Sequence, residues 1–214
     1  MQNEFTEARS TKTFIDNIVA FYKKNKFLIF LSIFILLFIF LATVFYLHAK
    51  EKKIQLTANL YISAKTDLNN NQMAKAKDTL IKIIESNNPT YSTLSLFLLI
   101  DANLMDDERK LIKFFDHILS NNKFEKEIEN LIIFKKALSQ SNYVDEIELI
   151  TTLNPLINSE TLWRSHALLL LGDYFFSKGE FSKAKENYLK ILSLADSNDL
   201  QGQAKYRLQL QSND

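Results

Sequence analysis

The side chains best suited to chemistry in this sequence are three histidines. His48, His117 and His166 lie 49 or more residues apart, and none belongs to a His-x3-His or His-Glu pair. Protein metal sites commonly draw two ligands from one such local motif. We therefore expect no metal site, and we interpret each histidine as a surface or groove residue.

A short acidic cluster consists of Asp101, Asp106, Asp107 and Glu108. Paired carboxylates can act as general acid and base. Negative charge also stabilises the first turn of a helix, where the helix dipole is positive. We favour the second interpretation and expect a helix to begin at this cluster.

Other patterns that indicate catalysis or ligand binding are missing from the sequence. Three scattered glycines cannot form a phosphate-binding loop, and there is no Gly-x-Ser-x-Gly motif. The absence of cysteine removes disulfides, thiolate metal ligands and cysteine nucleophiles. A net charge of +1 argues against a strongly basic nucleic-acid binder. We predict a protein that is not an enzyme, with no cofactor and with neither nucleic acid nor a small-molecule substrate as partner.

The first structural element that the sequence indicates is a long apolar segment near the N-terminus. Phe27–Leu47 contains 21 consecutive residues without a charge, and about 31 Å of helix matches a hydrocarbon core of about 30 Å. A cleavable signal peptide has a shorter apolar region that ends at small residues, whereas Tyr46 and Leu47 are bulky. We expect a retained transmembrane helix embedded in the lipid bilayer. The predicted parts are a cytoplasmic tail (1–26), the membrane span (27–47) and a helical domain (48–214).

The orientation of the span follows weakly from the flanking charges. The tail contains five basic residues, and the other side contains Lys50, Lys52, Lys53 and Lys65. Basic residues are more frequent on the cytoplasmic side of membrane proteins. The charges favour a cytoplasmic N-terminus.

The remainder of the chain is typical of an all-α protein. Apolar residues recur at helical spacing, and Asn or Ser clusters separate the apolar segments. We expect about nine helices of 10–20 residues and no strand, with Pro89 and Pro155 each preventing the preceding helix from continuing.

A period is visible in the small residues Ala64, Ala102, Ala137 and Gly172, which are 38, 35 and 35 residues apart. We place each of them midway along the first helix of a helical pair. A tetratricopeptide unit has a period of about 34 residues. The predicted fold is one N-terminal transmembrane helix followed by a tetratricopeptide-like α-solenoid of about four helical hairpins.

The last copy, Ser165–Asn198, resembles a tetratricopeptide repeat most clearly. In this interpretation Gly172 and Ala184 let the two helices approach, and Gly179 makes the turn. The residues at the signature positions are Leu168, Leu171, Gly172, Phe175, Gly179, Phe181, Ala184 and Tyr188.

The other copies are less regular. Thr57–Thr90 fits loosely, with Asn71 in the glycine position. Phe114 and Leu149 stand where the two middle copies should have a small residue, so we expect those hairpins to splay or to pack irregularly.

By resemblance to other tetratricopeptide proteins, part of each good repeat lines a groove for partners. Trp163 precedes the last repeat and is interpreted as packing between hairpins rather than as a binding anchor. The candidate groove residues are His166, Leu169, Asp173 and Phe176 in the last repeat, and Ala58, Tyr61, Lys65 and Leu68 in the first.

The complete layout resembles the YfgM-like family of single-span proteins, also called ancillary SecYEG translocon subunits. The resemblance covers roughly residues 4–210 and includes the charged, aromatic segment 14–25, the span, the Asn-Pro-Thr-Tyr link at 88–91, and the terminal repeat. It implies a bacterial inner-membrane protein with a periplasmic helical domain. It also implies association with the Sec translocon and a membrane-anchored periplasmic foldase during the maturation of exported proteins.

Two alternatives remain beside this hypothesis. One is a tetratricopeptide adaptor for envelope assembly or division, which has the same shape but other partners. The other is a membrane-tethered hydrolase with an unrecognised site, which requires a pocket where several polar side chains converge.

Overall fold

The computed structural model describes residues 2–194 and 198–212, and within them every regular element is an α-helix. The predicted all-α class and the number of nine helices are confirmed for this part of the chain. Chain contacts separate two units, residues 1–55 and 56–214. The helices are α1 (Gln2–Asn69), α2 (Met73–Ile84), α3 (Pro89–Asp101), α4 (Glu108–Asn121), α5 (Lys126–Gln140), α6 (Glu146–Ile157), α7 (Arg164–Ser177), α8 (Phe181–Leu192) and α9 (Asn198–Ser212).

The first unit consists of the greater part of α1. This helix has 68 residues and extends on both sides of the predicted span 27–47, because no Pro or Gly interrupts it before Asn69. Its backbone departs from helical geometry at Asn25, where φ is −116° and ψ is 16°. From Lys23 onward it is long and apolar enough to cross a membrane, which fits either an anchor or a signal sequence near the N-terminus.

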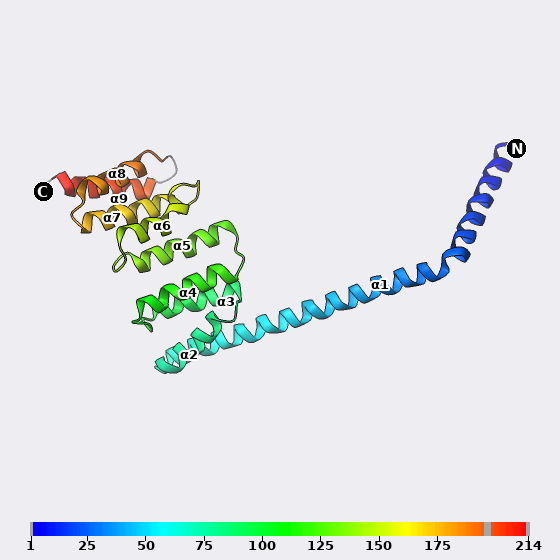
Figure 1. Cartoon of the computed structure of the whole chain (residues 1–214), viewed down its shortest axis with the longest axis horizontal. Helices are drawn as coiled ribbons and strands as arrows, with labels where there is room; N and C mark the ends of the chain where they lie inside the picture. The colour runs from blue at the N-terminus through cyan, green and yellow to red at the C-terminus, as the bar shows by residue number, and fades with distance from the viewer. Residues whose placement is uncertain (1, 195–197, 213–214) are drawn as a thin grey trace. The chain divides into compact units, whose positions relative to one another are not determined.

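The second unit contains the end of α1 and helices α2 to α9, which stack in chain order (Figure 1). Each helix from α2 to α8 contacts the next one along the chain. The end of α1 is joined to α2 by the ion pair between Asp67 and Lys75. Helix α9 packs on α8 and α7. This sequential packing is consistent with helical repeats.

Two hydrophobic clusters hold the stack together, and their boundary lies within α5. Ile132 belongs to the first cluster and Ala137 to the second, because residues five apart point to different sides of a helix. The buried residues of the first cluster are Ala64, Leu80, Ile84, Leu96, Leu99, Leu111, Phe114, Phe115, Ile118 and Ile132. Those of the second are Ala137, Leu149, Leu153, Leu156, Ala167, Leu168, Leu171, Tyr174, Phe175, Ala184, Tyr188, Ile191 and Ala204.

Four of the turns contain a residue in the left-handed region. Asn71, Asn87 and Asn103 have φ values of 58°, 57° and 49°, and Gly179 has 75°. Asn and Gly tolerate this conformation better than other residues, and it terminates a helix. The left-handed backbone at Asn71 and Gly179 agrees with the glycine position expected there.

The last hairpin is the most closely packed. A Cβ atom on Gly172 would lie 2.5 Å from Cε1 of Tyr188. Leu168, Leu171 and Phe175 are buried, as are Ala184 and Tyr188. Among the signature positions, Phe181 differs because it is half exposed at the start of α8, where its ring contacts Phe176. Residues 195–197, at the end of the expected repeat, lie outside the described residues.

One of the two expectations about proline is wrong. Pro155 does not end a helix but lies inside α6, where burial of Leu153 and Leu156 on either side of it favours continuation of the helix. Pro89, in contrast, is the first residue of α3, and Asn88 caps that helix by accepting hydrogen bonds from two backbone N–H groups.

The expected positions of two small residues are also wrong. Ala102 is the C-cap of α3, and Ala137 lies in the last turn of α5, so neither is midway along a first helix. The larger Phe114 and Leu149 are both buried in the core. Equal sequence spacing therefore does not place the same structural position in each hairpin, because the loops differ in length.

Candidate functional site

An aromatic row connects the first helices of successive hairpins. We use this name for Tyr61 on α1, Tyr91 and Phe97 on α3, Phe134 on α5, and Trp163 with His166 at the start of α7. Each of these side chains is half-buried, so one part packs within the fold and another part faces solvent.

The first contact of the row joins α1 to α3. The ring centroids of Tyr61 and Tyr91 are 5.9 Å apart, with an interplanar angle of 49°. Burial, followed by the carboxylate of Asp101, raises the pKa of Tyr61 above 10.0. Tyr61 therefore stays a neutral hydrogen-bond donor at physiological pH.

The second contact joins α3 to α5 through a cation–π pair. Nζ of Lys135 lies 5.8 Å from the centroid of the Phe97 ring. An ammonium group over an aromatic face is attracted by the ring quadrupole. This pair links α3 to α5.

The third contact joins α5 to α7 and contains three rings. Phe134 stacks on Trp163 at 5.4 Å, and His166 lies 5.7 Å from Phe134 and 5.3 Å from Trp163. Trp163 thus packs between hairpins, as the sequence indicated. Nδ1 of His166 is buried and has no hydrogen-bond partner among the described residues.

A pocket of about 510 Å³ lies beside the third contact. Its lining residues come from the start of α5, the loop before α7, the first turn of α7, and the link after α8. They are Glu127, Glu160, Thr161, Leu162, Arg164, Ser165 and Leu194.

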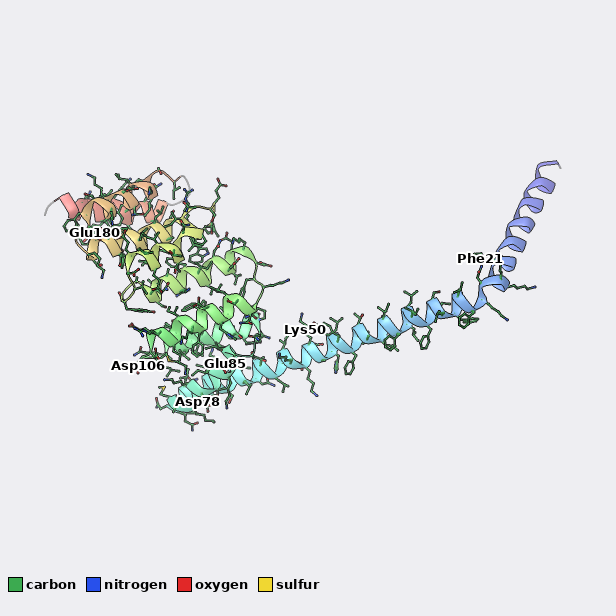
Figure 2. The ribbon with its side chains drawn as sticks, in the orientation of Figure 1. Phe21, Lys50, Asp78, Glu85, Asp106 and Glu180 are labelled. Atoms are coloured by element: carbon green, nitrogen blue, oxygen red, sulfur yellow. The ribbon has the colours of Figure 1, made fainter. Side chains whose placement is uncertain are left out.

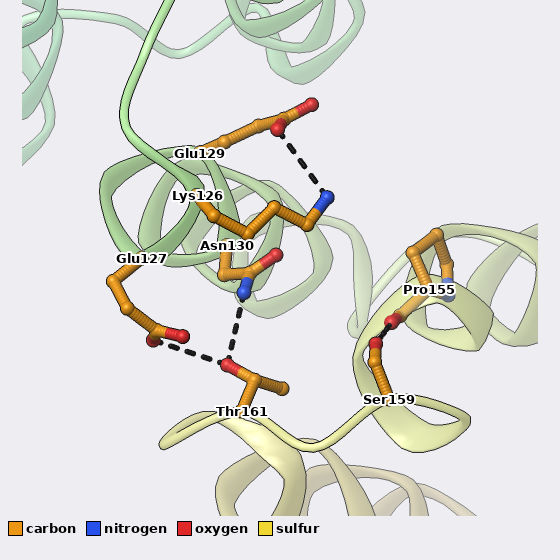
Figure 3. Close-up of polar contacts among 7 residues, drawn as sticks. All are labelled: Lys126, Glu127, Glu129, Asn130, Pro155, Ser159 and Thr161. Atoms are coloured by element: carbon orange, nitrogen blue, oxygen red, sulfur yellow. Dashed lines mark hydrogen bonds and ion pairs between the residues drawn. The ribbon is translucent and has the colours of Figure 1, made fainter.

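Thr161 connects the two sides of this pocket through its hydroxyl group (Figure 3). Asn130 Nδ2 donates to Thr161 Oγ1 at 2.9 Å, and Thr161 Oγ1 donates to Glu127 Oε2 at 3.1 Å. Asn130 is buried, so this chain of bonds fixes the 158–163 loop against α5. The neighbouring Arg164 Nε is buried without a hydrogen-bond partner in the described part of the chain.

The candidate groove residues of the last repeat have different surroundings. His166 belongs to the aromatic row, and Leu169 is half-buried against the second hydrophobic cluster. Asp173 accepts hydrogen bonds from Tyr188 Oη at 2.8 Å and from Arg207 Nε at 2.9 Å, so it holds α9 against α7. Phe176 contacts Phe181 at 5.5 Å.

The candidate groove residues of the first repeat all lie near the end of α1. Tyr61 belongs to the aromatic row, Ala58 and Leu68 are half-buried, and Lys65 is exposed. Tyr61 contacts α3, whereas His166 contacts α5. The two sets of candidate residues therefore lie on different helices, α1 and α7, and each set contributes one residue to the aromatic row.

Sequence reasoning missed Phe97, Phe134 and Lys135, and it assigned Tyr91 only to a link. The available signal was weak, since half-buried aromatic residues at helical spacing also occur in ordinary cores. The tertiary structure is needed to show that these rings contact aromatic or lysine side chains of a neighbouring helix.

The acidic cluster and the other two histidines lie outside the aromatic row. Asp107 caps α4 by accepting a hydrogen bond from the Lys110 backbone N–H at 3.0 Å, which confirms that a helix begins there. His48 is exposed on α1, and His117 lies on α4 beside Asn121. Across residues 2–194 and 198–212, no group of three His, Cys, Asp or Glu side chains is arranged to hold a metal ion.

Comparison of the chain with known proteins gives no match to a family model, to a curated protein or to a solved structure.

Proposed function

We propose that this chain is a membrane-anchored protein-interaction module, built from one transmembrane helix and a tetratricopeptide-like α-solenoid of four hairpins. The aromatic row is the observation that carries the proposal. Its rings belong to α1, α3, α5 and α7, and each ring is half-buried beside a residue of a neighbouring helix.

Such a row suits a segment of another protein better than a small ligand. Helical-repeat proteins present an extended surface that can hold a helix or an extended peptide. Aromatic residues are enriched among interface hot spots, because a rigid ring buries a large area at a low entropic cost.

The apolar part of α1 supports the anchoring role. Its exposed side chains include Phe30, Phe34 and Phe38, which water solvates poorly and hydrocarbon solvates well. In this proposal the segment remains as an anchor and is not removed. A surface tethered to the membrane has a high effective concentration for partners in the same membrane.

The partners follow from the resemblance to the YfgM-like family. They are the Sec translocon and a membrane-anchored periplasmic foldase, and the module assists the maturation of exported proteins at a bacterial inner membrane. In this placement the N-terminus is cytoplasmic and the 48–214 domain is periplasmic. An adaptor for envelope assembly or division is the alternative with the same surface.

Photo-crosslinking from the full-length protein in its native membrane tests this function. A photoreactive residue replaces His166 or Tyr61 in the row, or, as matched controls, exposed Lys113 on α4 or Lys185 on α8. We expect the row positions to crosslink to a Sec component or a foldase, and the controls to crosslink much less.

Recovery of envelope-assembly proteins from the row positions would instead support the alternative. Equal crosslinking from the row and the control positions would contradict the assignment of the surface.

A further inference from the structure

Lysine residues flank the apolar part of α1 at both ends. Lys23, Lys24 and Lys26 precede it, and we call them the N-terminal collar. Lys50, Lys52 and Lys53 follow it, and we call them the C-terminal collar. All six side chains are exposed, and residues 27–49 between the two collars contain no Asp, Glu, Lys or Arg.

We propose that each collar binds the headgroups of anionic phospholipids, one collar in each leaflet. This inference rests on the proposed membrane anchor and goes beyond it, because an apolar helix by itself does not distinguish anionic from zwitterionic lipids.

The spacing of the collars matches the thickness of a bilayer. Lys26 and Lys50 are 24 positions apart, which corresponds to about 36 Å of helix at 1.5 Å per residue. This length lies between the hydrocarbon thickness of about 30 Å and the full bilayer thickness of about 40–45 Å. Both ammonium sets therefore reach the headgroup layers at the same time. Figure 2 labels Lys50 on α1 near the C-terminal end of the apolar segment.

Five of the six collar lysines take part in no ion pair within the described part of the chain. These five are Lys23, Lys24, Lys26, Lys50 and Lys52. Glu51 is the single acidic residue within either collar. Basic residues at a membrane surface each attract anionic lipid by about 1 kcal/mol.

The lysines surround the helix and do not form one stripe. At about 100° per residue, Lys52 and Lys53 lie roughly 200° and 300° around the axis from Lys50. A collar of this kind faces lipid even when one side of the helix packs against another protein.

The presence of lysines at both ends of the apolar segment is not explained by membrane orientation alone. A signal that only sets orientation needs an excess of basic residues on the cytoplasmic side. Three lysines directly beside each end weaken that signal. Attraction to phosphate groups in both leaflets explains why the second collar is present.

The backbone break at Asn25 lies inside the N-terminal collar. Asn25 Nδ2 donates to the Phe21 carbonyl oxygen at 3.1 Å, and the non-helical φ and ψ of Asn25 interrupt the helix between Lys24 and Lys26. Lys23 and Lys24 therefore lie before the kink, whereas Lys26 lies on the helix that contains the apolar segment.

The test compares spin-labelled phosphatidylglycerol with spin-labelled phosphatidylcholine around the full-length protein in phosphatidylcholine vesicles. We expect the wild type to immobilise the anionic lipid at least about threefold more than the zwitterionic one, since several lysines each contribute. Gln at all three positions of one collar should remove about half of this preference, and Gln at all six positions should abolish it.

A matched variant controls for charge alone. Lys113→Gln, Lys185→Gln and Lys205→Gln together remove three exposed lysines of the helical domain, and this variant should keep the full preference. About 1 M salt should weaken the preference of the wild type, because it shortens the screening length to about 3 Å. Inorganic phosphate at millimolar concentration should not displace the labelled lipid, which identifies a lipid headgroup and not free phosphate as the ligand.

The possible failures are distinguishable. If phosphatidylcholine is immobilised but the anionic lipid is immobilised no more strongly, the collars are not lipid sites and the anchor still stands. If the six-substitution variant still prefers the anionic lipid, the collars are again not the lipid sites, and the anchor still stands. If neither lipid is immobilised, α1 is not in the bilayer, and both the anchor and this inference fail.

Discussion

The ring of Tyr188 occupies the space that a side chain on Gly172 would need. A Cβ atom on Gly172 would lie 2.5 Å from Tyr188 Cε1 and 2.8 Å from Cδ1. Tyr188 is completely buried, and its hydroxyl group donates to Asp173 Oδ1 at 2.8 Å. Because both ends of the ring are held, the ring cannot move aside freely, and α7 and α8 approach this closely only with glycine at position 172.

Gly172→Ala should therefore destabilise the helical domain. Overpacking a buried contact costs about 1–3 kcal/mol, and the higher helix propensity of alanine recovers about 1 kcal/mol of this. We expect a net loss of up to about 2 kcal/mol in the free energy of unfolding. Urea unfolding in mild detergent, followed by the fluorescence of the single tryptophan Trp163, measures it.

Gly202→Ala is the matched control. Gly202 also lies inside a helix, α9, but no atom lies within 4 Å of an added Cβ. This substitution should leave the stability unchanged or raise it by up to about 1 kcal/mol. Equal effects at Gly172 and Gly202 would contradict the close-packing role of Gly172.

The left-handed turn at Asn71 leads to a second prediction. Asn71→Ala should cost about 1 kcal/mol, since φ is 58° and alanine has no side-chain group that compensates for this conformation. Asn71→Gly should be close to neutral, because glycine adopts positive φ without a steric cost. Thermal unfolding of the two variants in the same detergent distinguishes them, and a glycine variant as unstable as the alanine one would argue against a backbone origin.

Tyrosine ionisation should destabilise the domain at alkaline pH. Burial and then the hydrogen bond to Asp173 raise the pKa of Tyr188 far above 10.0, and burial with the nearby Glu108 and Glu148 raises the pKa of Tyr143 to about 12. In the unfolded chain tyrosine loses its proton near pH 10, whereas the folded chain retains it. The unfolded state therefore binds fewer protons above about pH 10, and the free energy of unfolding falls as pH rises.

Tyr188→Phe isolates this effect from the general titration of lysines. The urea midpoint of the wild type should decrease more steeply between about pH 9 and about pH 11 than that of the variant, because phenylalanine has no proton to lose. Parallel curves would show that the Tyr188 hydroxyl does not contribute.

The membrane orientation can be measured directly in bacterial cells. If the N-terminus is cytoplasmic, protease added to spheroplasts should digest the 48–214 domain while the tail and the span stay protected. Lysed cells are the control, in which a cytoplasmic protein of known location must also be digested. Complete protection of the domain in intact spheroplasts would overturn the proposed orientation.

Local features of this protein were predictable because they depend on neighbouring residues. The 21 uncharged residues of 27–47 lie in one helix, and Gly179 and Asn71 make left-handed turns. The contact of Gly172 with α8 also followed from spacing, because its partner lies only one short hairpin away.

Pro155 and Ala102 show where the local rules failed. Pro155 lies inside α6 because the burial of adjacent leucines outweighs the hydrogen bond that proline cannot donate. Ala102 lies at a helix end because the loop after α3 is longer than the one after α7, although the sequence spacing looks uniform.

The sequence by itself therefore determined the helical class, the apolar segment and the tight last hairpin, since periodicity and backbone preferences act over a few residues. Only the tertiary structure decided which rings meet. Phe134 stacks on Trp163 across 29 positions of the chain, and Arg207 holds Asp173 across 34. Such pairs depend on the angle and register at which whole helices pack. Burial of the two hydrophobic clusters sets that angle and register, and no single segment of the sequence encodes them.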